Sequence, residues 1–150
     1  MFNHDRATIR RLAIFCAVII GLACWIESCN SKVHAAEIYH FKQSEFACKC
    51  CGKVVVDSRL IRKLEQLRHE LGDVPIVITS GYRCPRHNKG AGGANSSYHM
   101  KGLAVDIKVK HYSPAEIGHF AKMVGFTGVG VYRSWTHVDI RGGDLVCWKR

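Results

Sequence analysis

Two kinds of spacing alternate along the chain after about residue 56. Apolar side chains between residues 60 and 71 recur at the three- and four-residue spacing of a helix that buries one face. Asp57 and Ser58 can cap the start of this helix, and Gly72 ends it. The β-branched run over residues 75–80 (PIVITS) predicts a buried strand. This region therefore begins with one helix followed by one strand.

The second half of the pattern predicts three strands and one helix. Residues 103–109 alternate, with apolar side chains at the odd positions. The segment 113–116 (SPAE) is a capping box with proline at the first helical position, and it starts a helix that Gly125 stops. Residues 129–132 and 136–141 predict two more strands. The order of elements predicts an α+β domain, a small and mostly antiparallel sheet with helices packed on it.

Polar side chains on two of these strands indicate where chemistry takes place. The period of two places His137, Asp139 and Arg141 on one face of their strand, opposite apolar neighbours. Asp106 is likewise the polar residue between Val105 and the next apolar position. If the two strands are neighbours in the sheet, Asp106 and His137 face the same cleft.

The segment between residues 81 and 101 adds one more candidate. It is rich in Gly, Asn and Ser, and a loop of about 20 residues without structure of its own is usually functional in a compact domain. His99 lies near its end, and Gly102 allows the chain to turn back into the strand of Asp106. His99, Asp106 and His137 therefore form a candidate metal site, because a mixed set of three ligands leaves a fourth position for water, as in catalytic zinc sites.

The spacing of these residues alone does not establish that they bind a metal. A single histidine in a loop is more often a surface residue, and a buried aspartate on a strand is more often a salt-bridge partner. The remaining histidines of the region lack a comparable context, and we expect them to be solvated or structural. They are His40, His69, His87, His111 and His119.

The first 35 residues follow a different pattern. Three arginines precede an apolar run of fifteen residues, 12–26, and a polar stretch then leads to Val33-x-Ala35, a small-residue cleavage site. This order is typical of a secretory signal peptide, so we expect residues 1–35 to be a leader and residues 36–150 to be the mature domain. The run is short for a membrane span, which needs roughly 20 residues, and an uncleaved anchor is the alternative. The protein is thus expected to be exported, periplasmic or secreted, and membrane-anchored only if the leader is retained.

Composition indicates a folded domain, and net charge indicates which kinds of molecule the protein binds. With 47% hydrophobic and 23% charged residues, the 150-residue chain is unlike a disordered protein. The 22 Lys and Arg exceed the 12 Asp and Glu, and the region after the leader keeps a surplus of eight positive charges. An exported protein with this surplus does not usually meet nucleic acid, and an anionic cell-wall polymer or lipid surface fits it better. The alternative is that the basic surface only maintains solubility. We expect a monomer.

Five cysteines follow the leader, at positions 48, 50, 51, 84 and 147. The spacing Cys48-x-Cys50-Cys51 suggests a zinc knuckle. However, adjacent cysteines seldom both reach one tetrahedral ion, and a second cysteine pair at metal-ligand spacing is missing. Export permits disulfides, so we expect disulfides that join the N-terminal loop to the core, in a pairing that the sequence does not specify.

Several blocks of residues together resemble a known family. They are Ser80-Gly81-Tyr82-Arg83, Asn88, Gly92-Gly93, Ser97-x-His99-x-x-Gly102-x-Ala104-x-Asp106, Gly128-x-Gly130-x-Tyr132 and His137-x-Asp139-x-Arg141. The chain from about residue 41 to residue 141 is similar to the zinc D-Ala-D-Ala carboxypeptidases, within a wider group of peptidoglycan peptidases with a hedgehog-like fold. The segment 41–48 (FKQSEFAC) resembles the start of the small single-domain branch of this family.

The resemblance implies a set of roles for individual residues. It implies one zinc ion per chain, held by His99, Asp106 and His137. Arg83 matches the family arginine that contacts the substrate and stabilises the developing oxyanion, a role that suits a planar and always charged guanidinium. Ser97 matches a position that hydrogen-bonds the substrate.

The sequence departs from the family pattern at the general base. Some relatives carry a glutamate three residues before the last ligand, and Ser134 occupies that position here. Asp139 is the nearest substitute carboxylate by strand parity, and it is the candidate base. Alternatively, Asp139 orients a metal ligand or pairs with Arg141.

The function expected from the resemblance is zinc-dependent hydrolysis of D-amino-acid-containing peptide bonds in peptidoglycan stem peptides or cross-links. The sequence does not separate a carboxypeptidase from an endopeptidase. The alternative from another class is a catalytically inactive, zinc-containing module that binds cell wall, which Ser134 favours.

Overall fold

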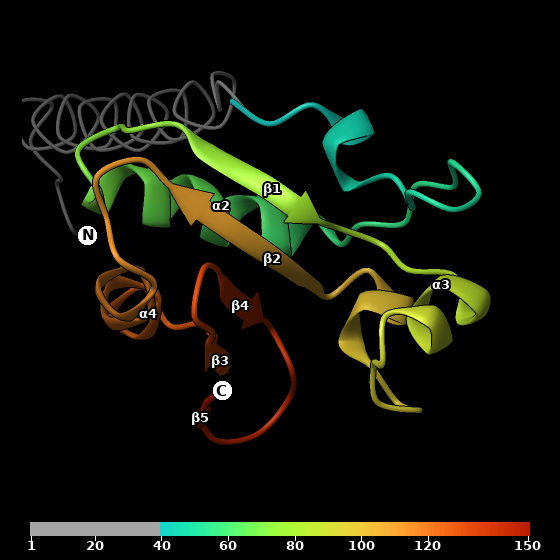
Figure 1. The fold of residues 1–150 in the computed structure, drawn as a ribbon. Helices are drawn as coiled ribbons and strands as arrows, with labels where there is room; N and C mark the ends of the chain where they lie inside the picture. Colours follow the sequence, from blue (N-terminus) through green and yellow to red (C-terminus); the bar gives the residue numbers. More distant parts are fainter. Residues whose placement is uncertain (1–39) are drawn as a thin grey trace, which may run out of the picture. The chain divides into compact units, whose positions relative to one another are not determined.

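The computed structural model describes residues 40–150 (Figure 1). The expected leader, residues 1–35, and its possible retention as an anchor lie outside the described residues. Within residues 40–150, no helix combines the length and the apolar character that a membrane span needs.

A five-stranded sheet organises the domain. The strands follow the order β1-β2-β4-β3-β5, and every neighbouring pair is antiparallel except β3 and β5, which are parallel. This confirms the predicted α+β class with a mostly antiparallel sheet. The strands are β1 (Ile76–Ser80), β2 (Ala104–Val109), β3 (Gly128–Val131), β4 (Thr136–Asp139) and β5 (Val146–Lys149).

Two helices cover the apolar face of the sheet. Figure 1 shows α2 (Ser58–Glu70) behind β1 and β2 and α4 (Pro114–Met123) beside β3 and β4. Both begin as predicted: Asp57 accepts a hydrogen bond from the backbone at the start of α2, and Ser113 and Glu116 complete the capping box of α4.

Three short helices and one strand were not predicted. The segment expected to be a loop between residues 81 and 101 contains α3 (Pro85–Gly90) and the 3-10 helix η2 (Tyr98–Lys101). A further 3-10 helix, η1 (Gln43–Phe46), precedes the predicted region. The last strand, β5, adds to the edge of the sheet beside β3.

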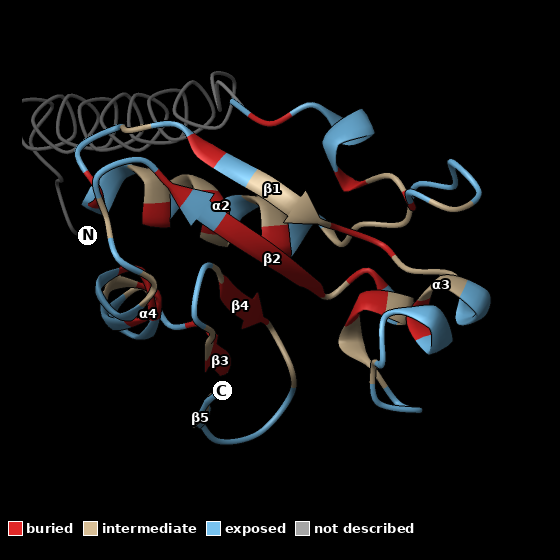
Figure 2. Ribbon diagram, viewed as in Figure 1, coloured by how far each residue is buried: buried red, intermediate tan, exposed pale blue. Residues whose placement is uncertain are grey.

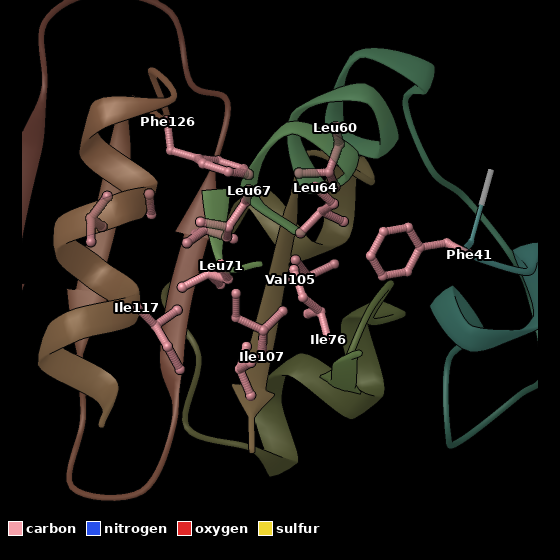
Figure 3. Packing of buried hydrophobic residues seen from close by; sticks show 14 of the residues in the cluster. Phe41, Leu60, Leu64, Leu67, Leu71, Ile76, Val105, Ile107, Ile117 and Phe126 are labelled. Carbon is pink, nitrogen blue, oxygen red and sulfur yellow. The ribbon is translucent and has the colours of Figure 1, made fainter. Parts of the chain in front are cut away.

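The core lies between the two helices and the sheet. Leucines of α2 meet Ile117 and Ala121 of α4 above Val105, Ile107 and Val138 of the sheet, and all of them are at most 2% exposed (Figure 3). Figure 2 shows β2 buried over most of its length, and its other face is buried at Ala104 and Asp106. Burial therefore does not alternate along β2 as its apolar and polar side chains do, because the polar residue Asp106 is buried as well.

The cap of α2 yields a test of stability. Asp57 accepts from the backbone N–H of Arg59 at 2.8 Å, and its Oδ2 lies 2.7 Å from the Arg59 guanidinium. The hydrogen bond from the Arg59 side chain holds the pKa of Asp57 below its usual range. Asp57→Ala is expected to lower the free energy of unfolding by about 1 kcal/mol.

The pH dependence of this effect follows from the direction of the shift. Because the pKa in the folded state is depressed, the contribution is complete above the unfolded pKa of about 4 and is lost as the pH falls through the folded pKa. Urea unfolding of both proteins across this range measures it. Asp57→Asn, which keeps a capping oxygen, should lose less stability at neutral pH. A difference between wild type and Asp57→Ala that stays constant at acid pH would contradict the role of the carboxylate.

Candidate metal centre

The register of the sheet brings the three predicted ligands together. Strands β2 and β4 are neighbours, and Asp106 pairs directly with His137. His99 projects from η2, which ends at Gly102 with a φ of 69° before the chain enters β2. His99 Nε2, Asp106 Oδ1 and His137 Nδ1 form a triangle with edges of 3.1, 3.3 and 3.0 Å. The expectation that Asp106 and His137 face one cleft is confirmed.

The outer hydrogen bonds of the two histidines decide which nitrogen atoms face this triangle. His99 Nδ1 lies 2.8 Å from the carbonyl oxygen of Gly81 and must donate to it, which leaves a lone pair on Nε2. His137 Nε2 lies 3.0 Å from Asp139 Oδ2 and donates to that carboxylate, which leaves a lone pair on Nδ1. In the neutral tautomers set by these outer hydrogen bonds, two lone pairs and the oxygen of Asp106 point at one position, which a cation can occupy.

The donor set and its dimensions fit a zinc ion. Zinc prefers imidazole nitrogen and carboxylate oxygen at about 2.0–2.1 Å in a tetrahedral arrangement, which places ligand atoms about 3.3 Å apart. The observed edges of the triangle are 3.0–3.3 Å. Three protein ligands on one side leave the fourth position toward the cleft, as a catalytic site requires.

The charges around the triangle favour a bound cation. Burial raises the pKa of Asp106, but hydrogen bonds to His137 and His99 outweigh burial and hold the pKa well below the usual range. Burial lowers the pKa of His99, which keeps that ring neutral and able to bind a metal. Burial also lowers the pKa of His137, but its hydrogen bonds to Asp106 and Asp139 outweigh burial and raise it. The position therefore attracts positive charge.

Asp139 lies behind His137 rather than in the cleft. Its side chain is 0% exposed, and it accepts from Arg141 Nε at 2.8 Å and from the Arg141 backbone at 3.1 Å in addition to His137. Gly128 makes room for it, because a Cβ at position 128 would collide with the carboxylate. Burial raises the pKa of Asp139, but hydrogen bonds from Arg141 and His137 outweigh burial and hold the pKa well below the usual range.

This placement does not favour Asp139 as the general base. A base must reach the proton that it accepts, and a fully buried carboxylate engaged by Arg141 is a weak acceptor out of reach of the cleft. The geometry favours both alternatives given by the sequence, since Asp139 orients His137 and also pairs with Arg141. Ser134 is exposed, in the turn between β3 and β4, and does not line the cleft.

The triangle opens into a cleft of about 570 Å³, and Arg83 and Ser97 are among the residues that line it. Arg83 Nε donates to Ser80 Oγ at 2.8 Å, and its Nη2 donates to Asp106 Oδ2, the oxygen that is not part of the triangle. Arg83 therefore holds Asp106, a predicted ligand, in place and borders the cleft. Among the described residues that line the cleft, Asp106 is the only carboxylate.

Sequence reasoning missed the aromatic wall of the cleft. Tyr132 and Trp135 stack at 4.7 Å between ring centroids, and Trp148 Nε1 donates to the Tyr132 hydroxyl at 3.2 Å. The Arg141 guanidinium lies over the Tyr98 ring at 4.8 Å and over the Trp148 ring at 5.3 Å. Gly130 in β3 is the local signal for this wall, because a Cβ at that position would collide with the Trp148 ring.

Comparisons with known proteins agree with this geometry. The family model for peptidase M15 matches residues 39–140. The zinc D-Ala-D-Ala carboxypeptidase of Streptomyces albus G is 35% identical over 90 residues, which are 58% of this chain and 35% of that protein. The probable peptidoglycan L,D-endopeptidase MepK of Haemophilus influenzae is 27% identical over 101 residues, which are 63% of this chain and 54% of that protein. The chain thus spans about a third to a half of the length of these curated relatives.

The family match covers most of the chain and includes every residue of the triangle and the strands that carry it. The expected family is therefore confirmed, and the chain belongs to the peptidase M15 family.

Proposed function

We propose that the protein is an exported zinc peptidase that hydrolyses D-amino-acid-containing peptide bonds in peptidoglycan stem peptides or cross-links. The observation that carries this proposal is the convergence of two imidazole lone pairs and one carboxylate oxygen at the floor of a cleft. Membership of a peptidase family supports hydrolysis, and the names of the two relatives support zinc and peptidoglycan. A catalytically inactive wall-binding module is not favoured by these relatives.

In this proposal His99, Asp106 and His137 hold one zinc ion. A bound zinc ion supplies Lewis-acid chemistry, since it polarises a carbonyl and lowers the pKa of water. Asp139 keeps His137 in the tautomer that presents Nδ1, and Arg141 keeps Asp139 ionised. Arg83 faces the cleft with a permanent positive charge that suits a substrate oxyanion or carboxylate.

The cleft also supports a peptidoglycan peptide as the partner. Arg83, Arg141 and Arg150 line it, and they provide positive charge for the carboxylates of a stem peptide. The stacked pair of Tyr132 and Trp135 provides an apolar surface for small side chains such as that of alanine. We propose a monomer that acts on this substrate outside the cytoplasm and binds no nucleic acid.

The full-length protein incubated with purified muropeptides tests the proposal. Hydrolysis is expected to stop on chelation and to return on addition of zinc. Release of free D-alanine identifies a carboxypeptidase, whereas conversion of cross-linked dimers to monomers identifies an endopeptidase. Stoichiometric zinc at the triangle without cleavage of any muropeptide would support the inactive binding module and overturn the enzymatic proposal.

Replacement of Asp139 separates its two possible roles. Asp139→Asn keeps the shape but removes the charge that holds His137 Nε2–H, so zinc affinity is expected to fall roughly 10- to 100-fold. Activity should then recover in excess zinc. Zinc titration and hydrolysis rates of the same protein measure both quantities. If zinc binds normally and hydrolysis is abolished, Asp139 carries the proton, as the sequence first suggested.

A further inference from the structure

Four cysteines gather beside the start of α3, and none of them lines the cleft. The sequence predicts disulfides between the N-terminal loop and the core, but the structure holds Cys48, Cys50, Cys51 and Cys84 as free thiols within residues 40–150. The Sγ atoms of Cys48, Cys51 and Cys84 all lie within 4.8 Å of one another. The loop and the core thus meet through a cluster of sulfur atoms.

The N-terminal part of this cluster is a turn closed by backbone hydrogen bonds. Cys48 and Cys51 have the spacing Cys-x-x-Cys that is common among zinc ligands. Gly52 follows with a φ of 71°, a conformation that favours glycine, and its N–H donates to the carbonyl oxygen of Cys48 at 2.8 Å. The turn therefore brings two thiols from one short segment close to the thiol of Cys84.

A second pair of ligands with the same spacing faces this turn. In the sequence alone, the absence of a second cysteine pair speaks against a zinc site. Cys84 and His87, however, form a mixed pair with the spacing Cys-x-x-His. Cys84 caps α3, and its Sγ accepts from the backbone N–H of His87 at 3.4 Å. The first turn of α3 brings His87 Nδ1 to 3.4 Å from Cys48 Sγ.

We propose that Cys48, Cys51, Cys84 and His87 bind a second zinc ion with a structural role. Tetrahedral zinc with Zn–S of about 2.3 Å and Zn–N of about 2.0 Å requires sulfur–nitrogen separations of about 3.5 Å. The 3.4 Å separation of Cys48 Sγ and His87 Nδ1 meets this requirement. The group with all mutual separations within 4.8 Å consists of the three thiols, so the His87 ring must move closer to Cys51 or Cys84 to complete the set. Three cysteines and one histidine close the coordination sphere, and a closed sphere is typical of structural rather than catalytic zinc.

Cys50 stays outside the ligand set although it lies close. Its Sγ is 3.7 Å from Cys84 Sγ, but it accepts hydrogen bonds from Arg86 Nε at 3.2 Å and from Arg86 Nη2 at 3.0 Å. The two contacts with the guanidinium thus give this sulfur a partner outside the proposed ligand set. This resolves the difficulty of adjacent cysteines, because only Cys51 of the pair is needed.

The second site fixes the segment that carries the cleft. Cys84 directly follows Arg83, whose backbone N–H donates to the carbonyl oxygen of His99 at 3.2 Å. The N–H of Cys84 in turn donates to Cys48 Sγ at 3.4 Å. A metal held here ties the N-terminal loop to the point at which Arg83 and His99 meet.

Metal content of the full-length protein, purified with zinc and without reducing agent, tests the proposal. Wild type should contain two zinc ions per chain. Cys84→Ser and His137→Ala should each contain one, and the double variant should contain none. Cys147→Ser is the matched control, because Cys147 is an exposed cysteine outside the cluster, and it should keep both ions. Cys50→Ser should also keep both, and His87→Cys should retain the second ion through a fourth thiolate.

Cobalt substitution decides the result even if a cysteine variant fails to fold. The triangle in the cleft contains only nitrogen and oxygen ligands, so, of the two sites within residues 40–150, a thiolate-to-cobalt charge-transfer band in wild type reports the cysteine site and not the triangle. Absence of this band, or an intact mass lower by two hydrogen atoms because of a disulfide within the cluster, overturns the proposal. Loss of the second ion in Cys50→Ser but not in His87→Ala overturns the ligand set. Failure of the protein to cleave muropeptides affects none of these readouts.

Discussion

Replacing His137 with alanine is expected to remove the zinc ion of the cleft and to reduce muropeptide hydrolysis by at least about 1,000-fold. His137 Nδ1 is one corner of the ligand triangle, and two remaining donors rarely hold a catalytic zinc ion. Loss of the ion removes several kcal/mol of transition-state stabilisation, and each 1.4 kcal/mol is a factor of ten in rate. Hydrolysis rates together with metal content measure the effect.

His119→Ala is the matched control for this variant. His119 is an exposed histidine in α4 and does not line the cleft, so its loss should change neither metal content nor rate. Circular dichroism shows whether the His137→Ala protein keeps its sheet. A folded His137→Ala protein that hydrolyses muropeptides at close to the wild-type rate would remove the triangle from the mechanism.

Arg83→Ala is expected to lower turnover by roughly 100-fold or more in saturating zinc, as for the loss of one oxyanion donor. Its second effect is on the metal, because Arg83 also donates to the outer oxygen of Asp106. Zinc affinity should therefore weaken, but zinc should still bind. Arg83→Lys should recover little, since an ammonium group lacks the planar fork that contacts Ser80 and Asp106 at once.

Arg133→Ala controls for the loss of an arginine. Arg133 is exposed in the turn between β3 and β4, and it does not line the cleft. Steady-state kinetics at several zinc concentrations separates the loss of turnover from the weaker zinc affinity of Arg83→Ala. Excess zinc restores metal binding, whereas it does not restore the missing contact with the substrate. If Arg83→Ala regains the full rate in excess zinc, Arg83 acts only through Asp106.

The sequence predicts those elements whose signal is local. The leucines of α2 repeat at helical spacing over three turns, and the capping box of α4 lies within four residues, so both helices follow from the pattern. Helix α3 has six residues and starts at a cysteine cap inside a Gly-rich segment, which gives no periodicity to detect. Strand β5 is four residues long and mostly exposed, and only its pairing with β3 makes it a strand.

The site likewise divides into residues with a local sequence signal and residues without one. The triangle was predictable because the alternation of side chains along the strands and the motif that runs from His99 to Asp106 specify its three residues. The alternation of side chains along the strand also placed Asp139 on the same face as His137. It does not show how deeply the carboxylate is buried. That burial distinguishes a base in the cleft from a carboxylate behind His137. The aromatic wall combines the turn before β4 with Trp148 of β5, and no local pattern connects segments that meet only in the folded sheet.

Strand β5 also divides the site into two parts that come from different stretches of the chain. All three residues of the triangle precede residue 138, whereas Trp148, which packs 5.3 Å from the His137 ring and forms part of the wall, belongs to the last strand. The metal position and the aromatic wall can therefore be varied separately, because a change in β5 alters part of the wall and none of the three predicted ligands.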